Sequence, residues 1–593
     1  MRRLIFLIVI INITILSAMS KKADKEILSD DWEYNTTKVM NDSKRMLPNG
    51  GVLSSPVAMS APKMVRSVKK IGMSVGGAKD TNNFKENIEN GYLPKLEAIT
   101  YEGQFYNHYF DTGLKGDECK VLFCPSYSTA KRLNQFSEEQ ELFLSVGLNS
   151  GIDEKDFNRK KLNLVVVLDI SGSMNSNFNA YHYDNLGNKI ENKEESSKHK
   201  MTIANESIVA MLKHLKNDDR VGVVLFDHNA YLAKPLNLVG KTDKKAIRDH
   251  ILELKARGGT NWSAGYKDGL KLFDEVKEDS SYENRIIFLT DAMPNRGELS
   301  KDKLFGMAKS ASAKGIHTTF IGIGVDFNND LVEYVSKTKG ANYFSVHSSK
   351  EFTKLLDKEF DYMVTPLVYD LELKLNSPIY TIEGVYGSPD SALATGTVMK
   401  INTLFPSHNN GVATKGGVVL LKLKENPQVA QTPDIFLSVS YKDIDGKEYH
   451  NKQKVKFDKK DIYYENSGIR KAILVSDYVS LMKNWLIDTR AGCNDEVKWI
   501  MEEPVAIMKR CMLYPPKHPA HPFMSAWERK SCQLKVSKGY KKLLNIFKKS
   551  YMAEQTVLKD ESLKKELNII NTLLTEKSSE IDKIRKDDWK FKE

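Results

Sequence analysis

The sequence lacks the short motifs that mark several common reaction centres. It contains no His-Glu-x-x-His, no Gly-x-Ser-x-Gly and no Gly-x-x-x-x-Gly-Lys-Ser/Thr, the patterns of metalloproteases, of serine nucleophile elbows and of phosphate-cradling loops. It also has no dense basic block with interleaved aromatic residues, although its net charge is +11. These absences argue against nucleic-acid binding and leave no marked catalytic centre, so we expect a protein that is not an enzyme.

Long apolar runs are also missing, except at the start of the chain. Arg2 and Arg3 precede an apolar stretch from Leu4 to Leu16, and small residues follow up to Ser20. This order predicts a secretory signal peptide over residues 1–20 and therefore a secreted or envelope-exposed protein with no membrane span after its removal. A retained signal anchor is the alternative, because the apolar stretch is long for a cleaved signal.

Cysteine is scarce, with five residues in the chain. An oxidising compartment would permit two disulfides and one free thiol, and we expect Cys119 to pair with Cys124 and Cys511 with Cys532 or Cys493. His518 and His521 lie between Cys511 and Cys532 and could suggest zinc. The surrounding prolines favour a Pro-rich loop instead.

The length of 593 residues exceeds what one hydrophobic core supports and predicts several folded units. From composition and periodicity we expect a signal peptide (1–20), a flexible N-terminal segment (21–85), a flanking region with strands (86–160), an α/β domain (161–365), an antiparallel β module (366–460) and a helical C-terminal region (461–593).

Residues 161–365 alternate between strand and helix patterns. The expected strands are 162–168, 221–226, 285–290, 318–323 and 342–346, and the expected helices lie near 200–216, 244–256, 263–277, 301–314, 328–338 and 350–361. Unbroken apolar strands alternating with helices predict a doubly wound, mostly parallel sheet covered on both faces. Such sheets bind ligands at the carboxyl ends of their strands.

The regions on either side of this domain show period-two alternation, in 141–147, 369–375, 419–424 and 435–441. Because such strands both precede and follow the α/β domain, we expect it to be inserted in one antiparallel β-sandwich. After Ser467 the pattern becomes helical. Near the end, a short coiled-coil-like seam could mediate oligomerisation, although packing onto its own protein is the more frequent outcome; the seam comprises Leu563, Leu567, Ile570, Leu574, Ile581 and Ile584.

Oxygen-bearing side chains follow two of the buried strands. Asp169, Ser171 and Ser173 leave the first strand, Asp291 ends a second apolar run, and Thr260 lies in a Gly-Gly-Thr-Asn loop between them. Carboxylate and hydroxyl oxygens suit one Mg²⁺ or Mn²⁺ ion, whereas zinc would recruit His or Cys. A metal-free domain that keeps these loops for folding is the alternative, because Ser and Thr also cap helices.

The pattern Asp-x-Ser-x-Ser, a distant Thr and a distant Asp resembles the metal-ion-dependent adhesion site of von Willebrand factor A domains, and all five positions match. The resemblance implies that Ser171, Ser173 and Thr260 approach the ion directly, while Asp169 and Asp291 act directly or through water. The flanks, including Asn90–Pro94, Leu122–Pro125 and Gly468–Val475, are similar to those of secreted or envelope bacterial proteins with this domain.

An ion held by neutral hydroxyls keeps much of its Lewis acidity and can accept a carboxylate from a partner. We therefore expect a metal-dependent adhesion protein that binds a protein ligand with an exposed Asp or Glu. One alternative is a hydrolase or protein-processing factor with an unmarked site. Another is a structural matrix protein whose metal only staples loops.

Overall fold

The computed structural model describes residues 28–35, 69–114, 119–137, 139–177, 198–277, 279–291, 298, 300–324, 334, 337–346, 349–389, 398–426, 435–491, 534–576 and 578–579. The expected signal peptide, Cys493, Cys511, Cys532, His518 and His521 lie outside these residues. Cys119 and Cys124 form the disulfide that was predicted.

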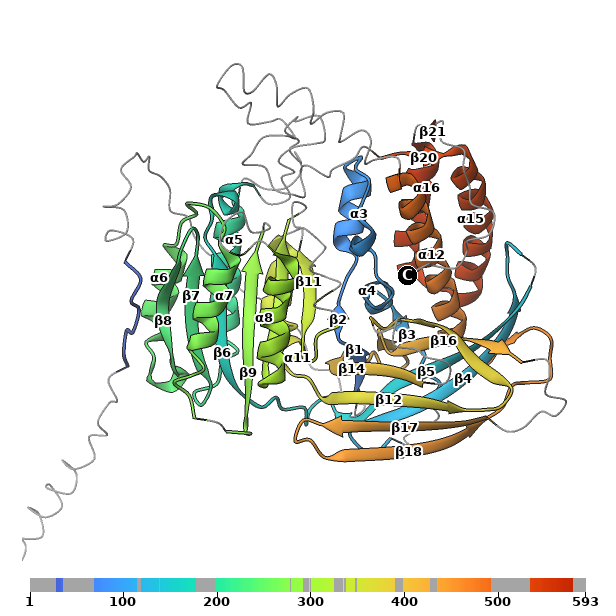
Figure 1. Ribbon diagram of the computed structural model, residues 1–593, viewed down its shortest axis with the longest axis horizontal. Helices are drawn as coiled ribbons and strands as arrows, with labels where there is room; N and C mark the ends of the chain where they lie inside the picture. Colours follow the sequence, from blue (N-terminus) through green and yellow to red (C-terminus); the bar gives the residue numbers. More distant parts are fainter. Residues whose placement is uncertain are drawn as a thin grey trace, which may run out of the picture.

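The α/β domain is built on a seven-stranded sheet (Figure 1). Its strands run in the order β2 (Gly77–Ala78), β11 (Asn342–Val346), β10 (Ile316–Ile323), β9 (Tyr282–Thr290), β6 (Lys161–Asp169), β7 (Arg220–Phe226) and β8 (Ala230–Leu238). All neighbouring strands pair in parallel except β7 and β8. The central strands are apolar and buried on both faces, as the sequence predicted.

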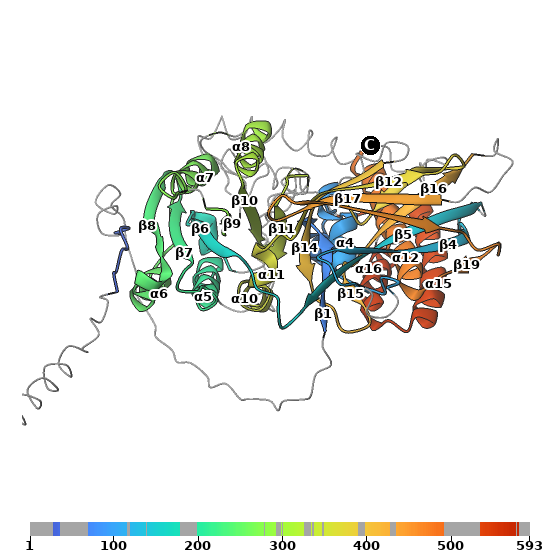
Figure 2. The same cartoon turned by 90° about the horizontal axis from the view of Figure 1, so that it is seen from below.

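Helices cover both faces of this sheet (Figure 2). One apolar cluster joins the sheet to α5 (Lys200–Leu212), α6 (Lys244–Leu252) and α10 (Ser349–Asp357). A second cluster joins the opposite face to α7 (Trp262–Lys271) and α8 (Lys301–Ala313). The doubly wound, mostly parallel architecture is confirmed.

A second, antiparallel sheet contains ten strands. Its main path runs β13 (Tyr380–Tyr386), β16 (Val418–Glu425), β5 (Gln140–Asp153), β1 (Lys70–Val75), β14 (Val398–Ser407), β12 (Val368–Asn376), β17 (Ile435–Asp443) and β18 (Glu448–Val455), and β4 (Cys124–Leu133) pairs with β5 and β19 (Tyr463–Tyr464). Strands β1, β4 and β5 precede the α/β domain and the others follow it. The domain is therefore inserted in this sheet, whose two ends contribute side chains to one core.

The structure corrects the expected boundary of the flexible segment. Within 21–85, residues Lys70–Val75 form β1 inside the antiparallel sheet, Gly77–Ala78 form β2 at the edge of the parallel sheet, and α3 (Asn82–Glu89) begins. Ile71, Met73 and Val75 alternate and are buried. The run is too short to stand out as a strand, and long-range pairing with β5 and β14 stabilises it.

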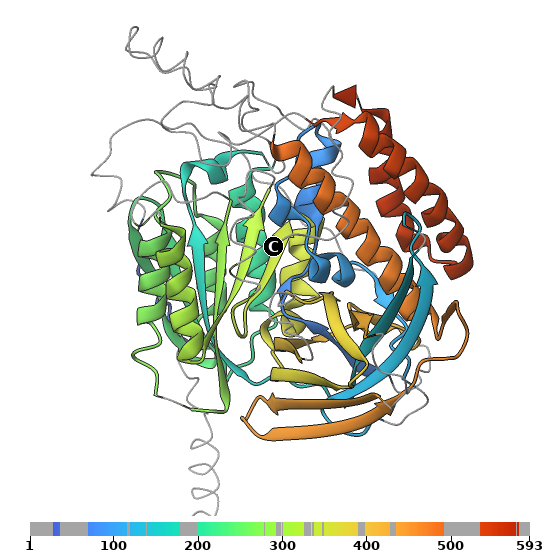
Figure 3. The same cartoon turned by 45° about the vertical axis from the view of Figure 1, so that its right-hand side comes forward.

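Three helices of the C-terminal region stand over the antiparallel sheet (Figure 3). They are α12 (Ser467–Ala491), α15 (Lys538–Leu558) and α16 (Lys564–Thr575), and they share one core with α3 and α4 (Tyr101–Tyr106). Leu563 and Ile570 of the predicted seam are fully buried in this core, so that part of the seam packs onto its own protein; Ile581 and Ile584 lie outside the described residues. Among the helices described, none has the length and apolarity that a membrane crossing requires.

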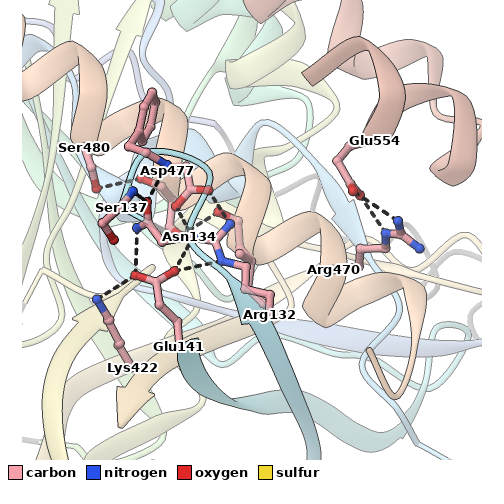
Figure 4. Close-up of polar contacts among 12 residues, drawn as sticks. Arg132, Asn134, Ser137, Glu141, Lys422, Arg470, Asp477, Ser480 and Glu554 are labelled. Carbon is pink, nitrogen blue, oxygen red and sulfur yellow. Dashed lines mark hydrogen bonds and ion pairs between the residues drawn. The ribbon is translucent and has the colours of Figure 1, made fainter. Parts of the chain in front are cut away.

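A buried ion network fixes α12 to the sheet (Figure 4). Arg132 of β4 places two guanidinium nitrogens 2.5 and 2.8 Å from the Asp477 carboxylate of α12. Its Nε donates to Glu141 of β5 over 2.9 Å, and Lys422 of β16 lies 2.7 Å from Glu141. Burial raises the pKa of Asp477, whereas Arg132 and Lys422 outweigh burial at Glu141 and lower its pKa.

Candidate metal centre

The first part of the centre is the loop that leaves β6. The strand ends at Asp169, which is completely buried, and a short 3-10 turn over Gly172–Asn175 follows. The amide of Ser171 donates to Asp169 Oδ1 over 2.7 Å, and the hydroxyl oxygens of Ser171 and Ser173 are 3.0 Å apart. The loop therefore holds both hydroxyls at the carboxyl end of a central strand.

The neighbouring strand β9 supplies the second carboxylate. Asp291 follows Thr290, the last residue of β9, and is also completely buried. Ser173 Oγ donates to Asp291 Oδ1 over 2.7 Å, and Thr290 Oγ1 donates to Asp169 Oδ2 over 2.6 Å. Because β6 and β9 pair in parallel, the two predicted aspartates emerge at the same edge of the sheet.

The Thr260 loop lies against the Asp169 loop. Thr260 is 2% exposed. Two backbone hydrogen bonds join the loops, from Gly172 N to Gly258 O over 3.0 Å and from Arg257 N to Ile170 O over 2.6 Å. Gly258 lies beside Asp227 and has a φ of +73°, a backbone conformation that only glycine adopts readily. The structure thus brings together the segments that carry all five predicted residues.

Two residues at the centre were not predicted from the sequence. Lys200, at the start of α5, is completely buried and places its Nζ 3.0 Å from Asp291 Oδ2. Asp227 follows β7. Its carboxylate lies 3.1 Å from Arg257 Nε in an ion pair, and its backbone oxygen accepts a hydrogen bond from the amide of Asn261 over 2.8 Å. Asp227 ends an apolar run, just as Asp169 and Asp291 do, and that position was a usable signal. Lys200 gave no comparable signal, because a single lysine at the start of a helix is common.

Burial and like charge dominate the electrostatics of the centre. Burial, followed by the negative charge of Asp291, raises the pKa of Asp169 to about 7, although hydrogen bonds from Thr290 and Ser171 act in the opposite direction. Two carboxylates in one buried site repel each other, and a cation between them favours their ionised forms. The amino group of Lys200 already supplies one positive charge on the Asp291 side.

The residues present fit a hard divalent cation. The converging side-chain atoms of Ser171, Ser173 and Asp291 are oxygens, and Asp169 adds a buried carboxylate whose charge is not matched by a direct ion pair in the described residues. These residues, with Thr260, would hold Mg²⁺ or Mn²⁺. Within the described part of the chain, no cluster of three or more His, Cys, Asp and Glu side chains is arranged for a metal.

Comparison with protein families identifies the region that carries this centre. Residues 164–294 match the model of the von Willebrand factor type A domain. The match begins in β6 and ends just after Asp291, so it includes the five predicted residues.

Individual proteins resemble about a third of the chain. An uncharacterized protein from Synechocystis sp. is 27% identical over 208 residues, which are 35% of this chain and 43% of that protein. Inter-alpha-trypsin inhibitor heavy chain H1 from Mesocricetus auratus is 25% identical over 226 residues, 37% of this chain and 22% of that protein. The chain thus matches less than half of the length of either relative.

A solved structure, a von Willebrand factor type A protein from Catenulispora acidiphila, matches 74% of this chain and 98% of its own, with 12% identity and a TM-score of 0.42.

Proposed function

We propose that this chain, which contains a von Willebrand factor type A domain, is a secreted or envelope-exposed protein that binds a protein partner through a metal ion. In this proposal Ser171, Ser173, Thr260, Asp169 and Asp291 hold one Mg²⁺ or Mn²⁺ ion. The partner contributes an Asp or Glu carboxylate as a further ligand. The inter-alpha-trypsin inhibitor heavy chain relatives are consistent with a protein-binding role.

One observation carries the proposal. The Ser173 hydroxyl lies 3.0 Å from the Ser171 hydroxyl and 2.7 Å from the Asp291 carboxylate, at the strand ends that also hold the buried Asp169. Neutral hydroxyls leave the ion with positive charge that a partner's carboxylate can neutralise. Binding is favoured over hydrolysis because a metal-activated water would also need a positioned general base. His228 is not such a base through its Nδ1, because this nitrogen already accepts a hydrogen bond from the amide of Gly259 over 3.0 Å.

The direct test measures Mg²⁺ and Mn²⁺ binding by calorimetry in the full chain and in Ser173→Ala. This change removes one proposed ligand and leaves the loop backbone intact, so we expect affinity to fall at least about tenfold. Asp169→Ala should abolish metal binding, and both variants should fail to capture an extracellular partner that wild type captures in Mg²⁺.

Asp156→Ala is the matched control, because Asp156 is exposed and precedes the start of β6, whereas the centre lies at the other end of that strand. It should bind metal and partner as wild type does. Partner binding that continues undiminished in chelator, or that acidic peptides do not inhibit, contradicts the proposed mode of binding. Turnover of a substrate would favour the hydrolase alternative.

A further inference from the structure

A cavity of about 350 Å³ lies where the α/β domain meets the rest of the chain. Its walls come from the link between β2 and α3, from α4, from β11 and α10, from β15 (Thr414–Lys415) and from α16. These elements belong to segments far apart in the sequence. The volume lies in the range of small-molecule sites.

Two lysines and one tyrosine of the cavity wall lie close together. The amino groups of Lys79 and Lys415 lie 4.6 and 4.1 Å from the centroid of the Tyr106 ring. Lys79 is 3% exposed, and its amino group donates only to neutral oxygens, Ser74 Oγ over 3.0 Å and Val75 O over 2.5 Å. Neither lysine forms an ion pair with any described residue.

Two carboxylates of the same wall have partners that occupy them. Glu359 lies 2.7 Å from His408 Nε2, and Asp80 accepts the amides of Ser345 over 2.8 Å and Asn82 over 3.1 Å. Glu359 and Asp80 therefore act on Lys415 only from longer range. Lys354 and Lys565 add two further amino groups to the lining.

The charges of Lys79 and Lys415 are accordingly poorly compensated. Burial, and then the charge of Lys415, lowers the pKa of Lys79 to about 7, although the charge of Glu102 acts in the opposite direction, and burial also lowers the pKa of Lys415. Keeping two ammonium groups in one partly buried cavity costs free energy unless an opposite charge joins them. An oxyanion would accept charge-assisted hydrogen bonds from both.

We propose that this cavity binds a small anionic molecule through a phosphate or carboxylate group held between Lys79 and Lys415 and beside Tyr106. The site is separate from the candidate metal centre. Because its walls come from the α/β domain, from α4, from β15 and from α16, bound anion stabilises the packing of these units against one another.

The test compares thermal unfolding and calorimetric binding of the full chain with inorganic phosphate, with citrate and with sodium chloride at matched ionic strength. We expect saturable stabilisation of wild type by phosphate, by citrate or by both, beyond the effect of chloride. A response to phosphate alone assigns phosphate chemistry, and a response to citrate alone assigns carboxylate chemistry.

Lys415→Met separates a ligand-binding lysine from a structural one. In the absence of anion we expect this variant to unfold at or above the wild-type temperature, because it removes an unpaired, partly buried charge. Its affinity for the effective anion should be at least about tenfold weaker. Lys565→Met, at an exposed position on the lining, should weaken binding by a smaller factor without affecting folding.

Lys424→Met is the matched control, since Lys424 is exposed and outside the lining; it should respond to anion as wild type does. Two results overturn the proposal. One is a wild-type protein that responds to phosphate and citrate no more than to chloride. The other is a Lys415→Met variant that keeps the full wild-type response.

Discussion

At the scale of single residues, Lys200 sets the electrostatic balance of the metal centre. Its amino group and the Asp291 carboxylate lie 3.0 Å apart, and both side chains are completely buried. A divalent ion held by Asp291 would share this carboxylate with a fixed positive charge nearby. Lys200 therefore stabilises the metal-free protein and weakens metal binding.

Replacing Lys200 with Met should separate these two effects. Without metal, Asp291 is left buried and unpaired, so the free energy of unfolding in chelator should fall by about 3 kcal/mol or more. With metal bound, the variant lacks the repulsion between the Lys200 ammonium group and the divalent ion. Both the affinity for Mg²⁺ and the stabilisation of the protein by Mg²⁺ should therefore increase. Urea unfolding in chelator and calorimetric titration with Mg²⁺ measure the two quantities.

Lys198→Met is the control for this prediction, because Lys198 is exposed and pairs with Glu206 on the surface. It should change neither the free energy of unfolding in chelator nor the free energy of Mg²⁺ binding by more than about 1 kcal/mol. A loss of Mg²⁺ affinity in Lys200→Met would instead mean that Lys200 holds Asp291 in position for the ion.

At the scale of elements, the ion network of Figure 4 decides how firmly α12 is attached to the antiparallel sheet. Arg132→Met would leave Asp477 and Glu141 in a buried site without their main counter-ion, although Lys422 still neutralises part of the charge on Glu141. Removing one partner of a buried ion network is strongly destabilising, so unfolding free energy should fall by about 3–5 kcal/mol. Chemical denaturation followed by circular dichroism measures this change.

Arg470→Met offers a matched comparison, because Arg470 belongs to α12, the helix that Arg132 attaches to the sheet. Arg470 pairs with Glu554 of α15, but the two side chains remain 28% and 22% exposed. Solvent compensates a lost partner at such a site, so we expect a loss of about 1 kcal/mol or less. Equal effects of the two substitutions would contradict the assignment of the Arg132 network as the stronger attachment.

Some helices and strands were predictable from sequence patterns, and others were not. Strands β6 and β9 were predictable because unbroken apolar runs are typical of buried parallel strands, and Asp169 and Asp291 were predictable because they end those runs. β8 was not predicted, because Lys234 and Pro235 interrupt its pattern; an edge strand tolerates both. Lys200 and the cavity around Lys415 depend on contacts between distant segments, which no local pattern records.

At the scale of the whole molecule, Glu566 connects segments of the chain that are more than 450 residues apart in the sequence. This buried residue of α16 accepts Gln104 Nε2 over 2.6 Å and Tyr551 OH over 3.1 Å, and it lies 3.1 Å from His108 Nε2. Burial alone would raise its pKa, but His108 and the hydrogen bonds outweigh burial and lower it. Ionised Glu566 therefore stabilises the packing of α16 against α4 and the residues that follow it.

The lowered pKa of Glu566 fixes the direction of a pH effect. Its contribution is fully present above the ordinary glutamate pKa of 4.5 and is lost as pH falls through the lower value of the folded protein, because the unfolded chain then binds more protons. Glu566→Gln should be less stable than wild type at pH 7, and this difference should shrink towards pH 4. Urea unfolding at pH 7, 5 and 4 measures the difference, and the exposed Glu448→Gln serves as the control with little effect at any pH. A difference that is constant from pH 7 to pH 4 would mean that the charge of Glu566 does not stabilise this junction, and that hydrogen bonding alone joins α16 to the N-terminal elements.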